Sequence, residues 1–168
     1  MKYLFLSAFF FAGTVFSVEQ LQVANPPVEE LSQMRTITQT VNEFYSCMSF
    51  DRGEQLSPEG LQDLFIQNAI LTSCNSNQSE HLSVPAFIES LKEKVSKQFF
   101  PYVIIREVSN KTDVFGKIAQ RFSTYEFRTD SQSCFGINSI QLILIDGSWY
   151  ITSMAWQDET ETIKVPSP

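Results

Sequence analysis

A polar side chain, that of Asn138, lies within a mostly apolar stretch of the C-terminal half of the sequence. Its neighbours Ile137 and Ile140 are aliphatic, and so are residues 142–145. A buried amide needs hydrogen-bond partners, and it can donate to or accept from a carbonyl or hydroxyl group. Two roles are therefore open to Asn138: contact with a bound ligand, or a hydrogen bond to a neighbouring side chain or water.

Three large aromatic residues, Tyr45, Tyr125 and Trp156, each combine an apolar ring with a polar group. Such side chains line ligand cavities, where the ring packs against the ligand and the polar group orients it. They also occur as ordinary core residues whose polar atom finds a partner within the protein. We regard these three residues as candidate cavity walls, with a purely structural role as the alternative.

Glu126 is the carboxylate that could act as a general base, depending on which way it points. Alternation along a strand places it on one face with Arg128 and Phe122, and places Tyr125 and Phe127 on the other. A solvated, charged outer face is the default for Glu126 and Arg128. If Glu126 instead faced inward, burial would bring its pKa toward neutrality and make it the best general-base candidate in the chain.

The cysteine and histidine pattern does not indicate a metal site or another cofactor. The chain has three cysteines, Cys47, Cys74 and Cys134, whose spacings match no zinc-binding pattern, and one histidine, His81. We expect the cysteines to act as small buried side chains, two of which could pair in an oxidising compartment. His81 lies in a polar segment and is expected at the surface. The alternative is that it gates the mouth of a cavity.

Helical periodicity dominates the first half of the chain. Apolar residues at steps of three and four predict a helix from Val28 to about Phe50. Ser57 as a cap and Pro58 at the first helical position predict a second helix, which is followed by a strand at 69–73. A third helix is expected over 83–97.

Strand-like segments dominate the second half. We expect strands at 102–108, 114–128, 134–145 and 148–157, with turns at 110–113 and 130–132. Asp146-Gly147 is a strong hairpin signal between the last two strands. Helices followed by an antiparallel meander predict an α+β domain with three N-terminal helices packed on a curved antiparallel sheet.

This order of elements resembles the nuclear-transport-factor-2-like (SnoaL-like) superfamily. The resemblance is carried by the aromatic pair Phe44-Tyr45, by the passage at 64–71 from second helix to first strand, and by the closing strands at 136–142 and 146–159. It implies a cone-shaped fold in which the sheet curls around the helices and leaves a cavity open at one end. Members include enzymes and binding modules, so the fold leaves the function open.

The resemblance also implies which residues surround the cavity. Members similar to steroid isomerases use an acidic base where this chain has Ser73, a tyrosine near Phe44, and a donor acid near Asn138. Because that acid–base set is changed, we expect binding rather than catalysis. The alternative is a cyclase, isomerase or hydrolase with a non-standard polar set, whose catalytic candidates are Asn138, Tyr45 and Glu126. The candidate ligand-binding residues are Phe44, Tyr45, Phe65, Ser73, Tyr125, Asn138 and Trp156.

The first seventeen residues have the pattern of a cleaved export signal. Lys2 precedes an uncharged apolar run at 3–16, and Val15 and Ser17 are small residues suited to cleavage after Ser17. The alternative, a membrane anchor, needs about 20 apolar residues. We therefore expect a periplasmic or secreted protein that is not inserted in the membrane after cleavage. The expected organisation is a signal peptide at 1–17, a lead-in at 18–32, the domain at 33–159 and a tail at 160–168.

Composition limits the partners. With 12 Lys and Arg against 19 Asp and Glu, the formal net charge is -7. An acidic surface repels phosphate backbones, which argues against nucleic acid. The aromatic content of 13% favours a small apolar or amphipathic ligand in the cone. A protein partner on the sheet, including a second copy forming a homodimer, is the other expectation.

Overall fold

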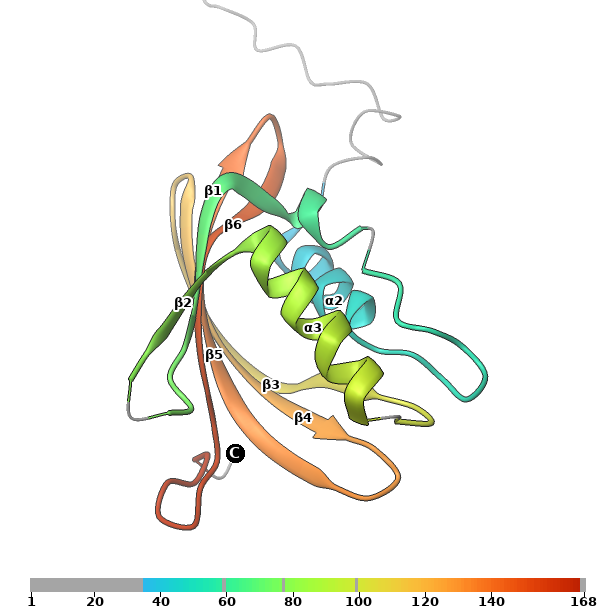
Figure 1. The fold of residues 1–168 in the computed structure, drawn as a ribbon. Helices are drawn as coiled ribbons and strands as arrows, with labels where there is room; N and C mark the ends of the chain where they lie inside the picture. Colours follow the sequence, from blue (N-terminus) through green and yellow to red (C-terminus); the bar gives the residue numbers. More distant parts are fainter. Residues whose placement is uncertain (1–34, 59, 77, 99, 167–168) are drawn as a thin grey trace, which may run out of the picture.

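The computed structural model describes residues 35–166 except 59, 77 and 99, and these form a mixed α+β domain (Figure 1). Two α-helices lie on one side of a strongly curved sheet. In chain order the elements are α2 (Ile37–Cys47), the 3-10 helix η1 (Gln62–Leu64), β1 (Phe65–Ser73), β2 (Glu80–Ser83), α3 (Val84–Gln98), β3 (Ile104–Phe115), β4 (Ile118–Arg128), β5 (Ser133–Ile145) and β6 (Ser148–Asp158).

The six strands form one sheet in the order β2-β1-β6-β5-β4-β3. Neighbours pair antiparallel except β1 and β6, which pair parallel. The expectation of an antiparallel sheet is therefore wrong for one strand pair, β1 with β6. A parallel pair needs a long crossover, and here everything from β2 to β5 lies between the two strands in sequence.

Helix α2 begins with a capping box. The Thr36 hydroxyl accepts from the Gln39 backbone N–H, while the Gln39 side chain accepts from the Thr36 backbone N–H. These two bonds satisfy donors that the first turn leaves unpaired. The buried face of the helix carries Val41, Phe44 and Tyr45 and packs on the concave side of the sheet. Helix α3 lies on the same side of the sheet (Figure 1).

The prediction of three N-terminal helices is wrong, because the described residues contain two α-helices and one short 3-10 turn, η1. The segment expected to form the second helix contains Gly60, a weak helix former. Strand β1 also begins at Phe65, four residues earlier than expected, because Phe65 pairs with Ile151 of β6. Too few residues are left between Pro58 and Phe65 for more than a single tight turn.

Two further boundaries differ from the sequence expectations. The predicted helix from Val28 to about Phe50 is wrong at both ends of its described part: α2 begins at Ile37, after Thr36 in an extended conformation, and ends at Cys47, while Phe50 pairs with Val103 in an isolated bridge. The polar run at 110–113, expected as a turn, lies inside β3. Because β3 is an edge strand, it tolerates polar residues, and the chain reverses instead at Gly116, whose φ is 57°.

The Asp146-Gly147 hairpin is confirmed between β5 and β6. Asp146 and Gly147 have φ values of 48° and 80°. Positive φ at both central residues matches the type I′ turn that joins twisted antiparallel strands. The hairpin fixes the pairing of β5 with β6, which contribute much of the concave face.

The expected export signal at 1–17 and lead-in at 18–32 lie outside the described residues and stay predictions. So does the start of the predicted first helix, at 28–34. Among the residues that the structure describes, no helix is both long and apolar enough to cross a bilayer.

Candidate functional site

A cavity of about 350 Å³ lies between the concave face of the sheet and the two helices. Its wall is mainly aromatic and aliphatic, with a few polar groups. The lining residues are Phe44, Tyr45, Met48, Asn75, Phe87, Leu91, Lys94, Ile105, Tyr125, Phe127, Gln132, Cys134, Asn138, Met154, Trp156 and Asp158. The volume falls within the range typical of small-molecule pockets, roughly 300–1,000 Å³.

Asn138 belongs to the polar part of this wall. It is 5% exposed on β5, where it pairs with Trp156 of β6 and Ser123 of β4. Its Nδ2 donates to the Tyr45 hydroxyl at 2.8 Å, and the Tyr45 hydroxyl lies 2.6 Å from Ser123 Oγ. Because Tyr45 accepts from Asn138, its own proton is available to Ser123. The three side chains thus form a buried hydrogen-bonded chain from β5 to α2 to β4.

The other arm of the Asn138 amide has no hydrogen-bond partner within the described part of the chain. No fully buried polar side-chain atom of the described residues lacks a partner, so this arm is reached from the cavity. The bond from Nδ2 to Tyr45 fixes the amide and leaves Oδ1 as the arm that presents an acceptor to the cavity. Asn138 therefore offers an oriented polar contact to a bound molecule.

Burial raises the pKa of Tyr45 from 10.0 to about 12, and the hydrogen bonds with Ser123 and Asn138 only partly oppose this effect. Moving a phenolate away from water is unfavourable, so the neutral hydroxyl is strongly preferred. Tyr45 is therefore a fixed hydrogen-bonding group at neutral pH. It is not suited to act as a general base there.

A second polar group lies where β6 ends. The Tyr125 hydroxyl donates to Asp158 Oδ1, and Asn75 Nδ2 donates to Asp158 Oδ2 at 2.6 Å. The Asn75 side-chain oxygen also accepts from the Asp158 backbone N–H at 2.7 Å. Burial, followed by the bond to Asp158 and its charge, raises the pKa of Tyr125. Tyr125 consequently stays protonated and holds the carboxylate of Asp158 in place.

Gly136 allows the Tyr125 ring to reach this position. A Cβ at Gly136 would lie 2.5 Å from Tyr125 Cζ and 2.7 Å from the Gln157 carbonyl oxygen. Such contacts are too short for any side chain, so only glycine leaves room for the ring against the backbone of β5. Gly136 thereby positions Tyr125 beside Asp158.

Solved structures with the same arrangement of helices and sheet include an NTF2-like protein of unknown function from Pseudomonas putida. It has a TM-score of 0.58 at 12% identity, covering 77% of this chain and 90% of its own. This chain has the NTF2-like fold. A Novosphingobium aromaticivorans protein, provisionally named a scytalone dehydratase, has a TM-score of 0.57 at 15% identity, covering 78% of this chain and 87% of its own.

The likeness extends to a eukaryotic structure, the yeast UBP3-associated protein BRE5, with a TM-score of 0.54 at 13% identity and coverage of 75% and 98%. No protein-family model and no curated protein matches the sequence. Identities this low establish the NTF2-like fold and leave the function to be argued from the cavity.

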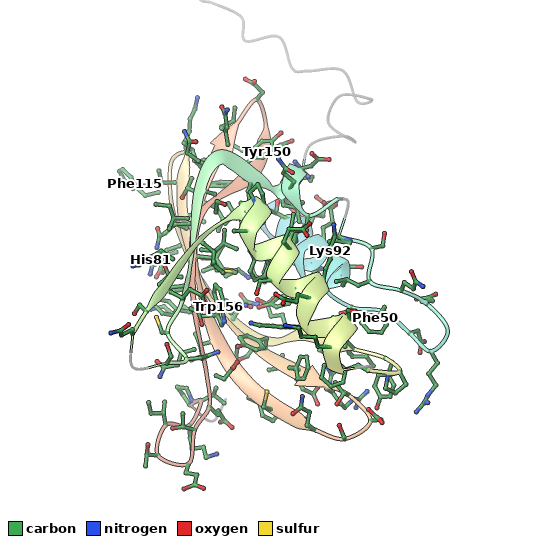
Figure 2. All side chains as sticks on the ribbon, viewed as in Figure 1. Phe50, His81, Lys92, Phe115, Tyr150 and Trp156 are labelled. Atoms are coloured by element: carbon green, nitrogen blue, oxygen red, sulfur yellow. The ribbon has the colours of Figure 1, made fainter. Side chains whose placement is uncertain are left out.

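Five of the seven predicted ligand-binding residues line the NTF2-like cavity: Phe44, Tyr45, Tyr125, Asn138 and Trp156. Figure 2 shows Trp156 between α3 and the sheet, whereas Phe115 points away from the helices. The Trp156 ring packs edge-to-face with Phe87 at a centroid distance of 5.7 Å. These five come from α2, β4, β5 and β6, which the fold brings together.

Phe65 and Ser73 are not brought into the cavity. Phe65 is buried beside Phe44, with ring centroids 6.1 Å apart, and borders a separate surface hollow that also includes Tyr150. Ser73 is half-buried opposite Trp156 at the end of β1, outside the lining.

Glu126, the conditional general base, does not line the cavity. It lies on the face of β4 opposite to Tyr125, where its side chain is only 12% exposed and not solvated as expected, and Arg106 Nε donates to its Oε2 at 2.8 Å. On the inward face of the same strand, Arg121 instead forms a buried ion pair with Glu107.

Asp158 is one of the cavity residues that the sequence did not identify. It is half-buried and lines the cavity. Alternation could have found it, because Met154, Trp156 and Asp158 occupy every second position and share one strand face. Phe87, Leu91 and Lys94 were also missed, although their spacing of four and three marks one face of α3.

Cys134 also lines the cavity, where burial, followed by the charges of Asp158 and Glu159, raises the pKa of its thiol. A raised pKa keeps the thiol protonated and weakly nucleophilic.

His81 is exposed at the sheet edge, as expected, with Nδ1 3.0 Å from Thr72 Oγ1. Among the described residues no group of three or more His, Cys, Asp or Glu could hold a metal ion.

Proposed function

We propose that the protein binds a small, ring-bearing amphipathic molecule in the cavity of its NTF2-like fold. The observation that carries the proposal is the open arm of the Asn138 amide, 95% buried as a residue and fixed by Tyr45 within an aromatic wall. A polar atom that faces a largely apolar cavity without a protein partner is unfavourable unless water or a ligand satisfies it. A ligand that carries a polar group deep in the cavity would supply that bond.

The cavity suits a molecule of one or two rings. Its 350 Å³ corresponds to about twelve water molecules at ~30 Å³ each. Burying one aromatic ring removes roughly 150–250 Å² from water, which is worth ~4 to 6 kcal/mol. Association itself costs a similar amount, so apolar burial alone supports only weak binding. Polar contacts such as the one at Asn138 then determine which molecule is preferred.

Binding is favoured over catalysis by the polar groups on the wall. Glu126 faces away from the cavity, and the Tyr45 hydroxyl is held neutral with a pKa of about 12. Asp158 does line the cavity, but both of its oxygens accept hydrogen bonds from Tyr125 and Asn75. Both oxygens therefore already have partners within the protein, and neither is left free to take a proton from a substrate unless one of these bonds is broken.

The test is titration with N-phenyl-1-naphthylamine, a neutral dye whose emission rises in apolar sites. We expect saturable binding at one site per chain. Leu91→Trp should reduce the affinity at least tenfold, because Leu91 lines the cavity and a larger ring would fill it. Trp156, on the opposite wall, provides an intrinsic fluorescence signal for the same titration.

Glu93→Trp is the matched control, because it places the same side chain on the exposed side of α3. Its dye affinity should equal that of the unmodified protein. Thermal unfolding of both variants shows whether they remain folded. Equal dye binding by all three proteins would place the dye outside the cavity, and an absence of saturable binding to the unmodified protein would overturn the proposal.

A further inference from the structure

The cavity wall is unusually rich in aromatic rings. Six lining residues are aromatic: Phe44, Tyr45, Phe87, Tyr125, Phe127 and Trp156. Several pack against each other at angles, such as Tyr45 and Tyr125 with centroids 6.4 Å apart and an interplanar angle of 40°. An aromatic ring has a negative face, which attracts cations that come within about 6 Å of its centroid.

These six rings hold no cation of the protein's own among the described residues. The two cation–π pairs of the described residues lie elsewhere, where Arg35 stacks on Tyr150 and Arg52 stacks on Tyr102. Neither tyrosine lines the cavity. The aromatic faces of the wall are therefore available to a bound molecule.

The charges on the wall are one acid and one base. In the described part of the chain, Asp158 is the only carboxylate that lines the cavity and Lys94 is the only cation. Asp158 is half-buried and held by Tyr125 and Asn75. A carboxylate offers about four acceptor positions, so two remain for a ligand.

Lys94 is placed where it opposes this charge weakly. Its side chain is exposed on α3, and it forms no ion pair among the described residues. Water and salt screen an exposed charge, whereas partial burial strengthens the field of Asp158. The net charge of -7 further favours the approach of cations over anions.

We infer that the cavity selects small organic ammonium ions that carry a ring. The ammonium group would lie between the Asp158 carboxylate and the faces of Tyr125 and Trp156, with the ring deeper against the apolar wall. This inference rests on the proposed function, whose ligand it narrows to one charge class. If apolar burial dominated, the cavity would select a neutral ring compound. If the charge of Lys94 dominated, it would select an anion.

Three probes of equal size separate these outcomes: benzyltrimethylammonium, its uncharged isostere neopentylbenzene, and benzylsulfonate. Each is measured by displacement of N-phenyl-1-naphthylamine. We expect the ammonium to bind about tenfold more tightly than neopentylbenzene, the scale of one cation–π contact in a desolvated site. Desolvation alone would favour the uncharged molecule, so this order needs the aromatic faces and Asp158.

Equal or tighter binding of neopentylbenzene would overturn the inference and leave the proposed function standing. Tightest binding of benzylsulfonate would overturn it in favour of Lys94, and displacement by none of the three would also overturn it. Failure of the dye itself to bind is a separate result, which overturns the proposed function.

Two cavity variants should change charge selectivity in opposite directions. Asp158→Asn should lower the ratio of ammonium to neopentylbenzene affinity about tenfold, and Lys94→Gln should raise it about threefold. Glu159→Gln is the control, because Glu159 neighbours Asp158 but pairs with Lys164 outside the cavity lining. If Asp158→Asn weakens both ligands equally while the Lys94→Gln ratio stays unchanged, the selectivity does not come from these charges and the inference fails.

Discussion

Tyr45 connects stability to pH at the scale of a single residue. Burial raises its pKa from 10.0 to about 12, so the folded state holds the phenol proton more tightly than the unfolded chain does. The resulting stability is present in full below pH 10 and is lost as the pH rises through about 12. At 1.36 kcal/mol per pKa unit, the total is roughly 2 to 3 kcal/mol.

Tyr45→Phe should therefore destabilise the protein most at neutral pH. There it removes the hydrogen bonds to Asn138 and Ser123, at about 1 to 2 kcal/mol. Near pH 11.5 this difference should vanish or reverse, because the unmodified protein loses about 2 kcal/mol there and the variant has no phenol to ionise at this site. Urea unfolding at pH 8 and pH 11.5 measures this change. Tyr150→Phe, outside the cavity, is the control, and a difference independent of pH would contradict the prediction.

Asn138 shows how far the sequence determines a site at this scale. The sequence left two roles for Asn138, contact with a ligand and an internal hydrogen bond. In the structure these two roles do not compete, because each would use a different atom of the amide. One arm donates to Tyr45, and the other is reached from the cavity. The apolar neighbours indicated burial, but the partner on α2 lies 93 residues away, and only tertiary packing brings the two together.

At the scale of elements, prediction succeeded where local chemistry decides the structure. The Asp146-Gly147 hairpin needs positive φ at both residues, and few other residue pairs allow it. Prediction failed at 57–64, where capping residues favoured a helix but pairing of Phe65 with β6 began the strand early. It also failed at 110–113, whose polar residues an exposed edge strand tolerates. Long-range pairing overrode local preference in both segments.

The packing of β4 against β5 gives a prediction at this scale. Gly136→Ala should destabilise the protein by about 1 to 3 kcal/mol, because the new methyl group would clash with Tyr125 and the Gln157 carbonyl oxygen. It should also displace Tyr125 from Asp158 and lower the ammonium selectivity. Urea unfolding and the probe series measure the two effects. Gly53→Ala, where a new methyl group would meet no atom within 4 Å, shows the effect of backbone strain alone. Unchanged stability of Gly136→Ala would contradict the expected clash.

At the scale of the whole molecule, the predicted export would determine which ligands the cavity can meet. A periplasmic or secreted protein is exposed to molecules outside the cytoplasm, and an acidic surface draws cations from that environment. The outer face of the sheet exposes Ile70, Ile118 and Phe122, and a homodimer through this face stays a prediction. Because the cavity lies on the opposite, helix-covered side, such a dimer would leave the cavity wall unchanged.

Cleavage after Ser17 is the prediction on which this setting depends. Expressed in a bacterial host, the protein should be recovered from the periplasm with Val18 as its first residue. Lys2 is the only charged side chain removed, which takes the net charge from -7 to -8. Phe10→Arg should block export, because an arginine within the apolar run costs roughly 2.5 to 3.5 kcal/mol on membrane insertion. Thr162→Arg adds the same charge in the exposed tail and should leave export unchanged. Intact-mass measurement of the two fractions decides, and an unmodified protein that keeps Met1 in the cytoplasm would remove the case for ligands from outside the cell.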